Sequence, residues 1–323
     1  MEKNNEKKRK VVEIIKKGGI VITPTDTVYG VICDGFNSES KKRIYKIKKR
    51  SSNKPLIGFI NTVEKAEKFV TIPEKFLSLV KKKWPGATTF IFESKVNIPF
   101  ITSEENKIGL RIPDYPFLLD ILSEFEIIAS TSANLSGEKT PSSVDEISEE
   151  VKEKVDLIID EGKTQGREST IWDLTGESPL LLRGKILFVC EGNSCRSPMA
   201  EYILKEYLKK RKVKIVVESA GISIITQGTA GEKTFQVMRE IGIDITGFYS
   251  KPLNFEKVEE ADLIFTMEEK QKDRIISFFP EAKDKIITLN VPDPAGKEIS
   301  YYRKTRDIIK KKIEEIVLKR IGK

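Results

Sequence analysis

The hydrophobic pattern of the first part of the chain predicts a helix followed by a buried strand. Residues 11–17 read as helix, Gly18-Gly19 follow, and the next three residues are the apolar run Ile20-Val21-Ile22. Glycine commonly terminates a helix, and a short continuous apolar run suits a buried strand. A helix and a strand that alternate in this way predict an α/β domain.

A second hydrophobic pattern begins near the middle of the chain. The first pattern ends at residues 180–184, and the apolar run at 185–190 predicts a strand that leads into a loop and a helix. Residues 198–209 place Ala200, Ile203, Leu204, Tyr207 and Leu208 on one helix face, and the C-terminal stretch repeats the spacing with Ile309, Ile313, Ile316 and Val317. We therefore predict two α/β domains, residues 1–184 and 185–323, with almost no linker.

The composition is that of a packed globular protein with a surplus of positive charge. Of the 323 residues, 39% are hydrophobic and 33% are charged, and the net charge is +8. This balance suits anionic ligands such as nucleotides, phosphates or RNA. No apolar run approaches the ~20 residues of a membrane span, and the charged start of the chain does not resemble a signal peptide. We therefore expect a cytoplasmic protein with no membrane partner.

The counts of cysteine and histidine narrow the chemistry. The three cysteines, Cys33, Cys190 and Cys195, cannot make a disulfide framework, and the sequence contains no histidine. This excludes zinc sites that need His and every nucleophile that a His activates. Catalysis must therefore use Cys, Asp, Lys, Arg, Ser or Thr.

The segment 189–198, V-C-E-G-N-S-C-R-S-P, has the features of an anion-binding loop that carries a nucleophile. The backbone N–H groups of a loop between a strand and a helix converge with the helix N-terminus on one spot, which attracts anions. Gly192 and Asn193 tolerate the left-handed backbone that a tight loop needs. Such donors would stabilise a thiolate at Cys190, and Arg196 can grip two phosphate oxygens. The segment therefore predicts a cysteine-dependent phosphatase.

Two further features of this half support that prediction. Pro198 suits the first position of the following helix, with Ser197 as its N-cap. The loop 291–296, V-P-D-P-A-G, is stiffened by prolines and carries one carboxylate, Asp293. A phosphatase needs an acid to protonate its leaving group, and Asp293 can fill this role.

Residues 185–323 resemble the low-molecular-weight protein phosphatase family in these two loops, in S-A-G at 219–221 and in A-D-L-I at 261–264. The resemblance implies a doubly wound parallel sheet and a phosphocysteine intermediate, with no metal and no cofactor. It assigns Cys190 as the nucleophile, Arg196 as the phosphate clamp, Ser197 as the hydroxyl that steadies the thiolate, and Asp293 as the general acid and later base. Gly192, Asn193 and Ser194 would bind the substrate, a phosphoprotein.

The resemblance leaves two substrates open, phosphoarginine and phosphotyrosine. Tyrosine phosphatases of the family have a bulky aliphatic residue where this chain has Ser194, and aromatic residues where it has Ala295-Gly296. Arginine phosphatases of the family have a small hydroxyl residue at the Ser194 position, typically Thr. Because a phenyl ring would find little to stack on, we favour a protein-arginine phosphatase, with a protein-tyrosine phosphatase as the alternative. An inactive domain that only binds proteins is disfavoured, since Cys190, Arg196 and Asp293 are all present.

Several short polar motifs are spread along the first half of the chain. They are P-T-D-T-V-Y-G at 24–30, K-K-R at 48–50, W-P-G at 84–86, L-R-I-P at 110–113, S-T-S-A-N-L-S-G at 130–137, S-T-I at 169–171, and Arg183. A polar turn at the carboxyl end of a strand is where open α/β sheets bind ligands. The three cations at 48–50 are close enough in sequence to embrace a triphosphate. The residues by themselves predict an anion-binding groove.

The order and spacing of these motifs resemble the YrdC family of threonylcarbamoyl-AMP synthases over residues 8–184. The resemblance implies a twisted open α/β sheet that converts L-threonine, bicarbonate and ATP, with Mg²⁺, into threonylcarbamoyl-AMP and pyrophosphate. The product would pass to the machinery that makes threonylcarbamoyladenosine in tRNA. The resemblance places Lys48, Arg50, Ser132, Asn134 and Arg183 at ATP, and Thr25, Arg111 and Ser169 near threonine. One departure is Ser51, which stands where the family usually has proline.

An RNA-binding module is the alternative for the first half. The segment 41–50 carries seven Lys or Arg residues and no acid. Such a run is either the solvated face of a helix or an edge that binds phosphate, for double-stranded RNA or a weak tRNA contact. Only Tyr45 could stack on a base within this run, which disfavours the RNA-binding module.

Overall fold

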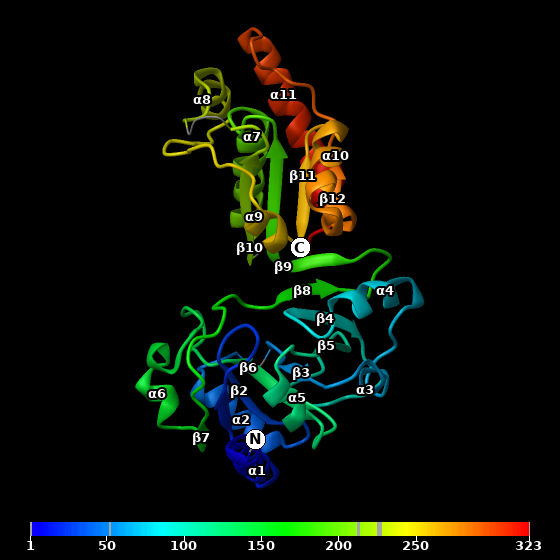
Figure 1. The fold of residues 1–323 in the computed structure, drawn as a ribbon, viewed down its shortest axis with the longest axis vertical. Helices are drawn as coiled ribbons and strands as arrows, with labels where there is room; N and C mark the ends of the chain where they lie inside the picture. Colours follow the sequence, from blue (N-terminus) through cyan, green and yellow to red (C-terminus); the bar gives the residue numbers. More distant parts are fainter. Residues whose placement is uncertain (1, 52, 212–213, 225–227, 323) are drawn as a thin grey trace. The chain divides into compact units, whose positions relative to one another are not determined.

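The structure is a computed structural model that describes residues 2–51, 53–211, 214–224 and 228–322 (Figure 1). It divides into two compact units, Met1–Pro179 and Leu180–Lys323. Strand β9 (Leu180–Cys190) begins the second unit and runs without interruption past residue 184, where the sequence pattern placed the domain boundary. Residues 180–184 form the first part of this strand.

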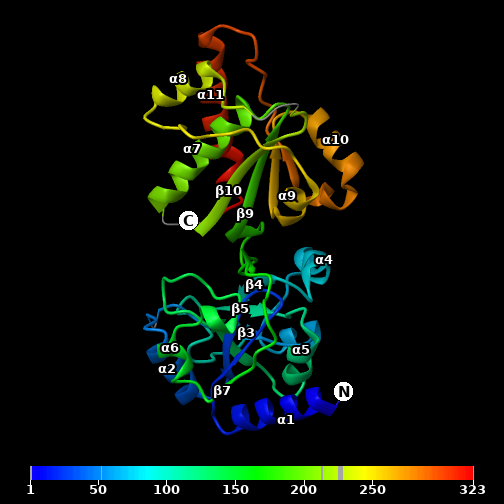
Figure 2. The ribbon, with the colours of Figure 1, turned by 60° about the vertical axis from the view of Figure 1, so that its left-hand side comes forward.

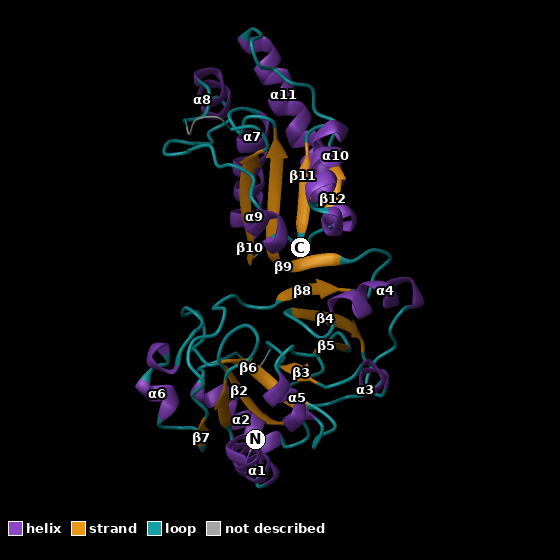
Figure 3. Cartoon of the chain, in the orientation of Figure 1, coloured by secondary structure: helices purple, strands orange, loops and turns teal. Residues whose placement is uncertain are grey.

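The first unit is built on a mixed β-sheet in the strand order β8-β4-β5-β3-β6-β2-β1-β7 (Figure 3). The strands are β1 (Val21–Thr23), β2 (Gly30–Asp34), β3 (Ile57–Phe59), β4 (Thr88–Glu93), β5 (Lys107–Arg111), β6 (Ile128–Ser132), β7 (Leu157–Ile158) and β8 (Thr170–Asp173). The helices are α1 (Glu2–Lys16), α2 (Ser38–Ile47), α3 (Val63–Glu67), α4 (Glu74–Lys83), α5 (Pro116–Leu122) and α6 (Glu149–Lys152), with a 3₁₀ turn at Val144–Glu146. Neighbouring strands are parallel in β4–β8, β3–β5 and β1–β7, and antiparallel in β1–β2, β2–β6, β3–β6 and β4–β5. This mixed sheet agrees with the predicted open α/β class.

Helices α1 and α5 cover one part of this sheet and bury its apolar side chains (Figure 2). Val11 and Ile15 of α1 pack in one cluster with Leu118 of α5 and with Val21 and Ile32 from the strands. The helix predicted over 11–17 is therefore the inner end of a longer helix, whose first two turns are polar. Gly18, with φ +80°, turns the chain out of α1 as its sequence position predicted.

The second unit is a doubly wound sheet of parallel strands in the order β10-β9-β11-β12. Its further strands are β10 (Lys214–Gly221), β11 (Leu263–Thr266) and β12 (Ile286–Thr288). Its helices are α7 (Arg196–Arg211), α8 (Glu232–Arg239), α9 (Phe255–Glu260), α10 (Glu269–Phe278) and α11 (Ile299–Lys312), with a 3₁₀ segment at Pro280–Lys285 and a π-helical turn at Ile313–Val317. The predicted parallel sheet is confirmed.

Both faces of this sheet are covered by helices, as Figure 2 shows. Leu187 and Val189 of β9 pack with Val258 of α9 and Ile275 of α10 on one face. Helices α7 and α11 pack against each other, and α7 contacts β9 and β10. Because successive strand residues point to opposite faces, the buried apolar run at residues 186–190 of β9 fits a strand covered on both sides.

Helix α7 begins at Arg196, two residues before the start predicted from Pro198. Ser197 therefore lies inside the first turn, and its hydroxyl lies at the sulfur of Cys190 instead of capping the helix. The apolar face of α7 is as predicted, because Ala200, Ile203, Leu204 and Leu208 are buried. Tyr207 is half-buried and donates its hydroxyl to Glu314.

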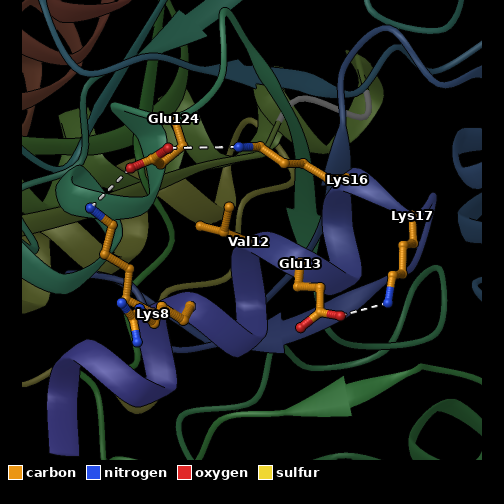
Figure 4. A pocket seen from close by; sticks show the side chains of 7 residues that line it. Lys8, Val12, Glu13, Lys16, Lys17 and Glu124 are labelled. Carbon is orange, nitrogen blue, oxygen red and sulfur yellow. Dashed lines mark hydrogen bonds and ion pairs between the residues drawn. The ribbon is translucent and has the colours of Figure 1, made fainter.

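A hollow on the outer side of α1 is lined by charged side chains (Figure 4). Its lining residues are Lys8, Arg9, Val12, Glu13, Lys16, Lys17 and Glu124. Glu124 pairs with Lys8 at 3.3 Å and with Lys16 at 3.7 Å, and Lys17 pairs with Glu13 at 2.5 Å. None of the site residues predicted from the sequence lines this hollow, and its ion pairs are those of a solvated helix face. In the part of the chain that the structure describes, no helix combines the length and apolar composition of a membrane span.

Candidate active sites

The loop that follows β9 directs its side chains in two ways. Its inner side chains are almost fully buried: Cys190, Asn193, Cys195, Arg196 and Ser197. Its outer residues, Glu191, Gly192 and Ser194, are exposed or half-buried. The loop therefore packs its polar inner residues beneath the bend and presents the outer ones at its mouth.

Asn193 holds this loop in shape. Its backbone φ is +49°, in the left-handed region where Asn is tolerated. Its Nδ2 donates to Ser197 Oγ and to Ser219 Oγ, each at 2.8 Å, and its Oδ1 accepts from the Lys251 amide at 2.8 Å. Gly192 has no left-handed φ, so Asn193 alone makes the bend for which the sequence suggested both residues.

Hydrogen-bond donors point at the sulfur of Cys190. Ser197 Oγ lies 2.9 Å from Cys190 Sγ. The Ser197 oxygen accepts from Asn193, and its own hydrogen can donate to the sulfur when Cys190 is a thiolate, which has no hydrogen to donate. Burial raises the pKa of the Cys190 thiol overall, although the Ser197 hydroxyl, the Ser197 and Asn193 amides and the Arg196 charge act to lower it. These donors stabilise the thiolate form.

Arg196 joins the loop to two carboxylates from distant parts of the chain. Its NH1 donates to Glu268 Oε2 at 2.7 Å and to the Val291 carbonyl at 3.2 Å, and its NH2 pairs with Asp293 Oδ2. The arginine is buried, whereas the Asp293 side chain is 43% exposed. Asp293 Oδ1 also accepts from the Ala295 amide at 3.0 Å. The structure thus brings the predicted acid to the predicted phosphate clamp across about a hundred residues of sequence.

Glu268 is a site residue that the sequence analysis missed. It is the N-cap of α10, where its side chain and that of Gln271 form a capping box. Burial acts to raise the pKa of Glu268, but the Arg196 hydrogen bond and the charges of Arg196 and Lys270 lower it overall. The E-x-x-Q capping pattern was visible in the sequence, but its contact with Arg196 was not.

A buried polar chain behind the loop was also missed. Glu201 of α7 is 1% exposed and accepts from Ser219 Oγ at 2.5 Å. An ionised carboxylate can only accept, so Ser219 donates to Glu201 and accepts from Asn193. The hydrogen bonds from Asn193 to Ser219 and Ser197 and from Ser219 to Glu201 therefore have defined directions, and Ser197 donates to Cys190 in the thiolate form. Lys205 and Lys251 pair with Glu201, the latter at 3.9 Å.

Ser194 and Cys195 are held from the side of α8 and α11. The Ser194 carbonyl accepts from the Gly231 amide and from Thr234 Oγ1, both at 3.1 Å. Cys195 Sγ lies 3.8 Å from the hydroxyl of Tyr302. Burial, together with Cys195, raises the pKa of Tyr302 to about 12, so this phenol stays protonated.

In the first unit, Arg111 is the centre of a buried polar cluster. It is 3% exposed at the end of β5, and its guanidinium contacts Asp26 Oδ1, Thr27 Oγ1 at 3.0 Å and the Gly86 carbonyl at 3.0 Å. Burial lowers the pKa of Arg111 and the Asp26 charge opposes this. Asp26 and Thr27 are part of the motif at 24–30, while Gly86 belongs to the motif at 84–86. The structure therefore brings three separate motifs together.

Thr25 contacts Thr27 of this cluster, and Ser169 contacts the neighbouring strand β4. Thr25 Oγ1 contacts Thr27 Oγ1 at 2.8 Å and accepts from the Thr27 amide at 3.0 Å, which closes the turn after β1. Ser169 Oγ lies 3.0 Å from Thr89 Oγ1. Phe90, the residue after Thr89, pairs with Leu110 across β4 and β5, so Ser169 lies near the end of β5 that carries Arg111. The three residues predicted near threonine are thus grouped.

Lys48 ties the end of α2 to the loop after β6. Its side chain is buried, and Nζ donates to the Ser132 and Asn134 carbonyls and to Asn134 Oδ1, the last at 3.3 Å. Burial lowers the pKa of Lys48 to about 7, with a contribution from Arg50. Gly30 pairs with Ser132 across β2 and β6, which places this loop beside the motif at 24–30.

The remaining cations do not join Lys48 in one cluster. Arg50 donates to the Lys54 carbonyl at 3.0 Å and the Pro55 carbonyl at 2.9 Å, and Lys49 pairs with Glu150 at 2.9 Å. The three neighbouring cations thus contact different partners in this structure, and their joint role at a triphosphate stays a prediction. Arg183 belongs to β9 of the second unit, and its role at ATP stays a prediction.

The basic run at 41–50 is not a single cationic face. Lys41 is buried, with Nζ donating to the Gly35 carbonyl at 2.5 Å. Lys42 pairs with Glu39 at 2.8 Å and Arg43 with Asp156 at 3.1 Å. Tyr45 is buried with its hydroxyl on the Lys54 carbonyl, so it presents no ring for base stacking.

Comparison with known proteins divides the chain between residues 184 and 185. Residues 13–184 match the Sua5/YciO/YrdC family model, described as telomere recombination, and residues 185–323 match the low molecular weight phosphotyrosine protein phosphatase family model.

Relatives are found for each half. A putative threonylcarbamoyl-AMP synthase of Methanocaldococcus jannaschii is 37% identical over 193 residues, which cover 58% of this chain and 91% of the relative. The low molecular weight protein-tyrosine-phosphatase Ptp of Acinetobacter johnsonii is 39% identical over 130 residues, 38% of this chain and 89% of the relative. The crystal structure of Escherichia coli YciO is similar with a TM-score of 0.51 and 28% identity, covering 55% of this chain and 88% of that one.

Proposed function

Residues 13–184 belong to the Sua5/YciO/YrdC family and residues 185–323 to the low-molecular-weight phosphatase family, and we propose from this that one chain carries two enzymes. The first is a threonylcarbamoyl-AMP synthase, and the second is a cysteine-dependent protein phosphatase. For the phosphatase, the observation that carries the proposal is the meeting of Arg196 with Asp293 beside the loop of Cys190.

In the phosphatase, the Cys190 thiolate attacks the phosphorus of the bound phosphoryl group. The bond to the leaving group breaks, and Asp293 in its acid form donates a proton to the leaving atom. This gives a phosphocysteine. A water molecule, whose proton passes to the Asp293 carboxylate, then attacks phosphorus and releases inorganic phosphate and the thiolate. Arg196 and the loop amides hold the phosphoryl oxygens and balance their charge.

Trapping the intermediate tests this assignment. Asp293→Asn retains the size of the side chain but cannot donate or accept the proton, so both chemical steps slow. This variant is mixed briefly with a phosphorylated substrate, and the reaction is then stopped with acid. Phosphate should remain on Cys190, where mass spectrometry detects it. A phosphatase active without a phosphorylated Cys190 would contradict the mechanism.

In the synthase, we assign Thr25, Arg111 and Ser169 to L-threonine, because the Arg111 cluster offers a buried cation to its carboxylate. We assign Lys48, Arg50, Ser132, Asn134 and Arg183 to ATP. The reaction joins bicarbonate-derived carbamate to the α-phosphate with loss of pyrophosphate, so the protein's task is positioning and charge balance. Threonine-dependent release of pyrophosphate from ATP, with threonylcarbamoyl-AMP identified by mass spectrometry, tests this function.

The family chemistry also implies Mg²⁺. Within the described residues, no group of three Cys, Asp or Glu side chains is arranged to hold a metal ion. This fits an ion that arrives with the nucleotide, since Mg²⁺ is commonly held by substrate phosphates and water. The ion would offset the charge of the triphosphate.

We further propose phosphoarginine as the substrate class of the phosphatase. Ser194 presents a small side chain at the mouth of the loop, and Ala295 follows the Asp-Pro pair without a ring to line the opening. A planar guanidinium fits beside such small residues, whereas a phenyl ring would lack aromatic contacts. Phosphotyrosine is the alternative, and turnover of matched peptides carrying each group decides between them.

The product of the synthase would be consumed by a threonylcarbamoyl transferase acting on tRNA in the cytoplasm. The three free cysteines suit such a reducing compartment. Any tRNA contact would be electrostatic and weak. A gel shift with transcript tRNA over a salt series, with and without ATP, measures it. Tight binding without ATP would favour an RNA-binding role for the first unit instead.

A further inference from the structure

The outer side chains of the phosphatase loop are the ones that meet the part of a substrate beyond its phosphate. These are Glu191 and Ser194, since the other side chains of the loop point inward. Glu191 directly follows the nucleophile, and its side chain is 43% exposed. A carboxylate beside a loop that binds a phosphate dianion repels that charge, and positive charge on the substrate would reduce the repulsion.

Glu191 is held in place on the rim. Its Oε1 accepts from Arg274 NH1 at 3.3 Å, and the same nitrogen donates to Ser223 Oγ at 2.8 Å. The Ser223 amide in turn donates to the Glu191 carbonyl at 2.9 Å. Among the described residues, nothing donates to Glu191 Oε2. The second oxygen is therefore a free acceptor on a side chain that is already oriented.

We propose that Glu191 determines substrate specificity by accepting an N–H bond from the guanidinium of a phosphoarginine residue. This rests on the proposed phosphatase function and deepens its substrate class. Phosphorylation of arginine uses one nitrogen, so N–H donors remain on the other nitrogens of the group, and they lie in the plane of the guanidinium. A phenyl ring has no such donor. Glu191 thus reads the atoms that distinguish a P–N from an aryl P–O substrate.

The other charges around the loop favour the same substrate. Arg196 is paired with Glu268 and Asp293, and Glu268 also has Lys270 at 3.2 Å. Arg274, 3.3 Å from Glu191 Oε1 in a partly exposed pair, compensates only part of the Glu191 charge. A phosphorylated arginine carries a guanidinium cation next to its phosphate. Glu191 can accept a hydrogen bond from this cation while Arg196 binds the phosphoryl oxygens. A phosphotyrosine ester brings only negative charge to this rim.

The test compares peptides of one sequence that carry phosphoarginine or phosphotyrosine, with the full chain and its Glu191→Gln and Glu191→Lys variants. The quantity measured is the ratio of kcat/KM for phosphoarginine to kcat/KM for phosphotyrosine. We expect Glu191→Gln to lower this ratio about tenfold, the effect of one charge-assisted hydrogen bond, and Glu191→Lys to lower it further. Most of the change should fall on KM for phosphoarginine.

Glu269→Gln is the matched control, because Glu269 is an exposed acid of α10 that pairs only with Lys272 among the described residues. Its ratio should equal that of the unaltered chain. An unaltered chain that hydrolyses phosphoarginine, with the same ratio in both Glu191 variants, overturns this inference and leaves the proposed function standing. An unaltered chain without phosphoarginine turnover overturns the proposed substrate class and this inference together.

Discussion

The hydroxyl oxygen of Ser197 lies 2.9 Å from the sulfur of Cys190, seven residues away along the chain. Asn193 donates to the same oxygen, and the Ser197 hydrogen can donate to the sulfur of the Cys190 thiolate. The orientation of this one hydroxyl depends on Asn193, Ser219 and the buried Glu201 behind it. The environment of the proposed nucleophile therefore depends on buried side chains behind the loop.

Replacing Asn193 tests this dependence. Asn193→Gly keeps the left-handed backbone and removes the side-chain bonds to Ser197 and Ser219, so we expect kcat for phosphate release to fall by tenfold or more. Asn193→Ala also imposes backbone strain at φ +49°, which should lower the free energy of unfolding by about 1 kcal/mol more. The melting temperature should fall accordingly. Thermal unfolding and single-turnover kinetics measure both. An Asn193→Gly variant with full kcat would show that Ser197 orients itself.

The two enzymes should fail separately. Cys190→Ser should abolish phosphatase turnover, because a serine hydroxyl does not ionise near neutral pH, and leave threonylcarbamoyl-AMP formation intact. Lys48→Ala should do the reverse, since Nζ of Lys48 holds the Ser132–Asn134 loop. Both activities are measured on each purified variant. Loss of both activities in either folded variant would contradict independent sites.

Enlarging Ser194 should change the substrate preference. Ser194→Ile fills the mouth of the loop with an aliphatic wall, which crowds a guanidinium and gives a phenyl ring an apolar surface worth about 0.5–1.5 kcal/mol per contact. The kcat/KM ratio should therefore move about threefold to tenfold toward phosphotyrosine. Ser194→Thr is the control that keeps a small hydroxyl. If the unaltered chain already prefers phosphotyrosine, the arginine assignment is wrong and only the broader phosphatase assignment remains.

Oxidation of the loop should be reversible. Peroxide converts the Cys190 thiolate to a sulfenic acid, and the Cys195 thiol can then displace water to form a disulfide within the loop. We expect dithiothreitol to restore activity in the unaltered chain and in Cys33→Ala, but not in Cys195→Ala, where oxidation proceeds further. Thiol counting follows the same samples. Equal recovery in Cys195→Ala would mean that Cys195 only packs beneath the loop against Tyr302.

The buried Lys48 should make the first unit more stable at alkaline pH. Burial lowers its pKa to about 7 in the folded chain, below the ordinary value of 10.5. Between these two values the unfolded chain binds more protons, so the free energy of unfolding rises with pH across this window. Both tryptophans of the sequence, Trp84 and Trp172, lie in the first unit, so their fluorescence reports its unfolding. In denaturant titrations, the free energy of unfolding of Lys48→Met should not rise with pH across this window. An identical rise in this variant would mean that a group other than Lys48 causes it.

Structural features that depend on residues close together along the chain could be predicted from the sequence alone. The strand, the loop and the helix around Cys190 follow from an apolar run, from residues that tolerate a tight bend, and from a helix start. The motif order identified both families, and the Asp-Pro loop identified Asp293. The predicted start of α7 at Pro198 was two residues late, because Arg196 and Ser197 are already helical with their side chains buried beneath the loop.

Contacts between side chains that are far apart in the sequence became visible only in the tertiary structure. Glu268 and Ser219 contact Arg196 and Asn193 because the parallel strands β9, β10 and β11 end at one edge of the sheet, and Glu201 of α7 contacts Ser219 behind them. Likewise, Lys41 is buried within a run that composition marks as solvated. A side chain's partners depend on how elements pack, and packing is set by burial summed over the whole unit, so no local pattern contains it.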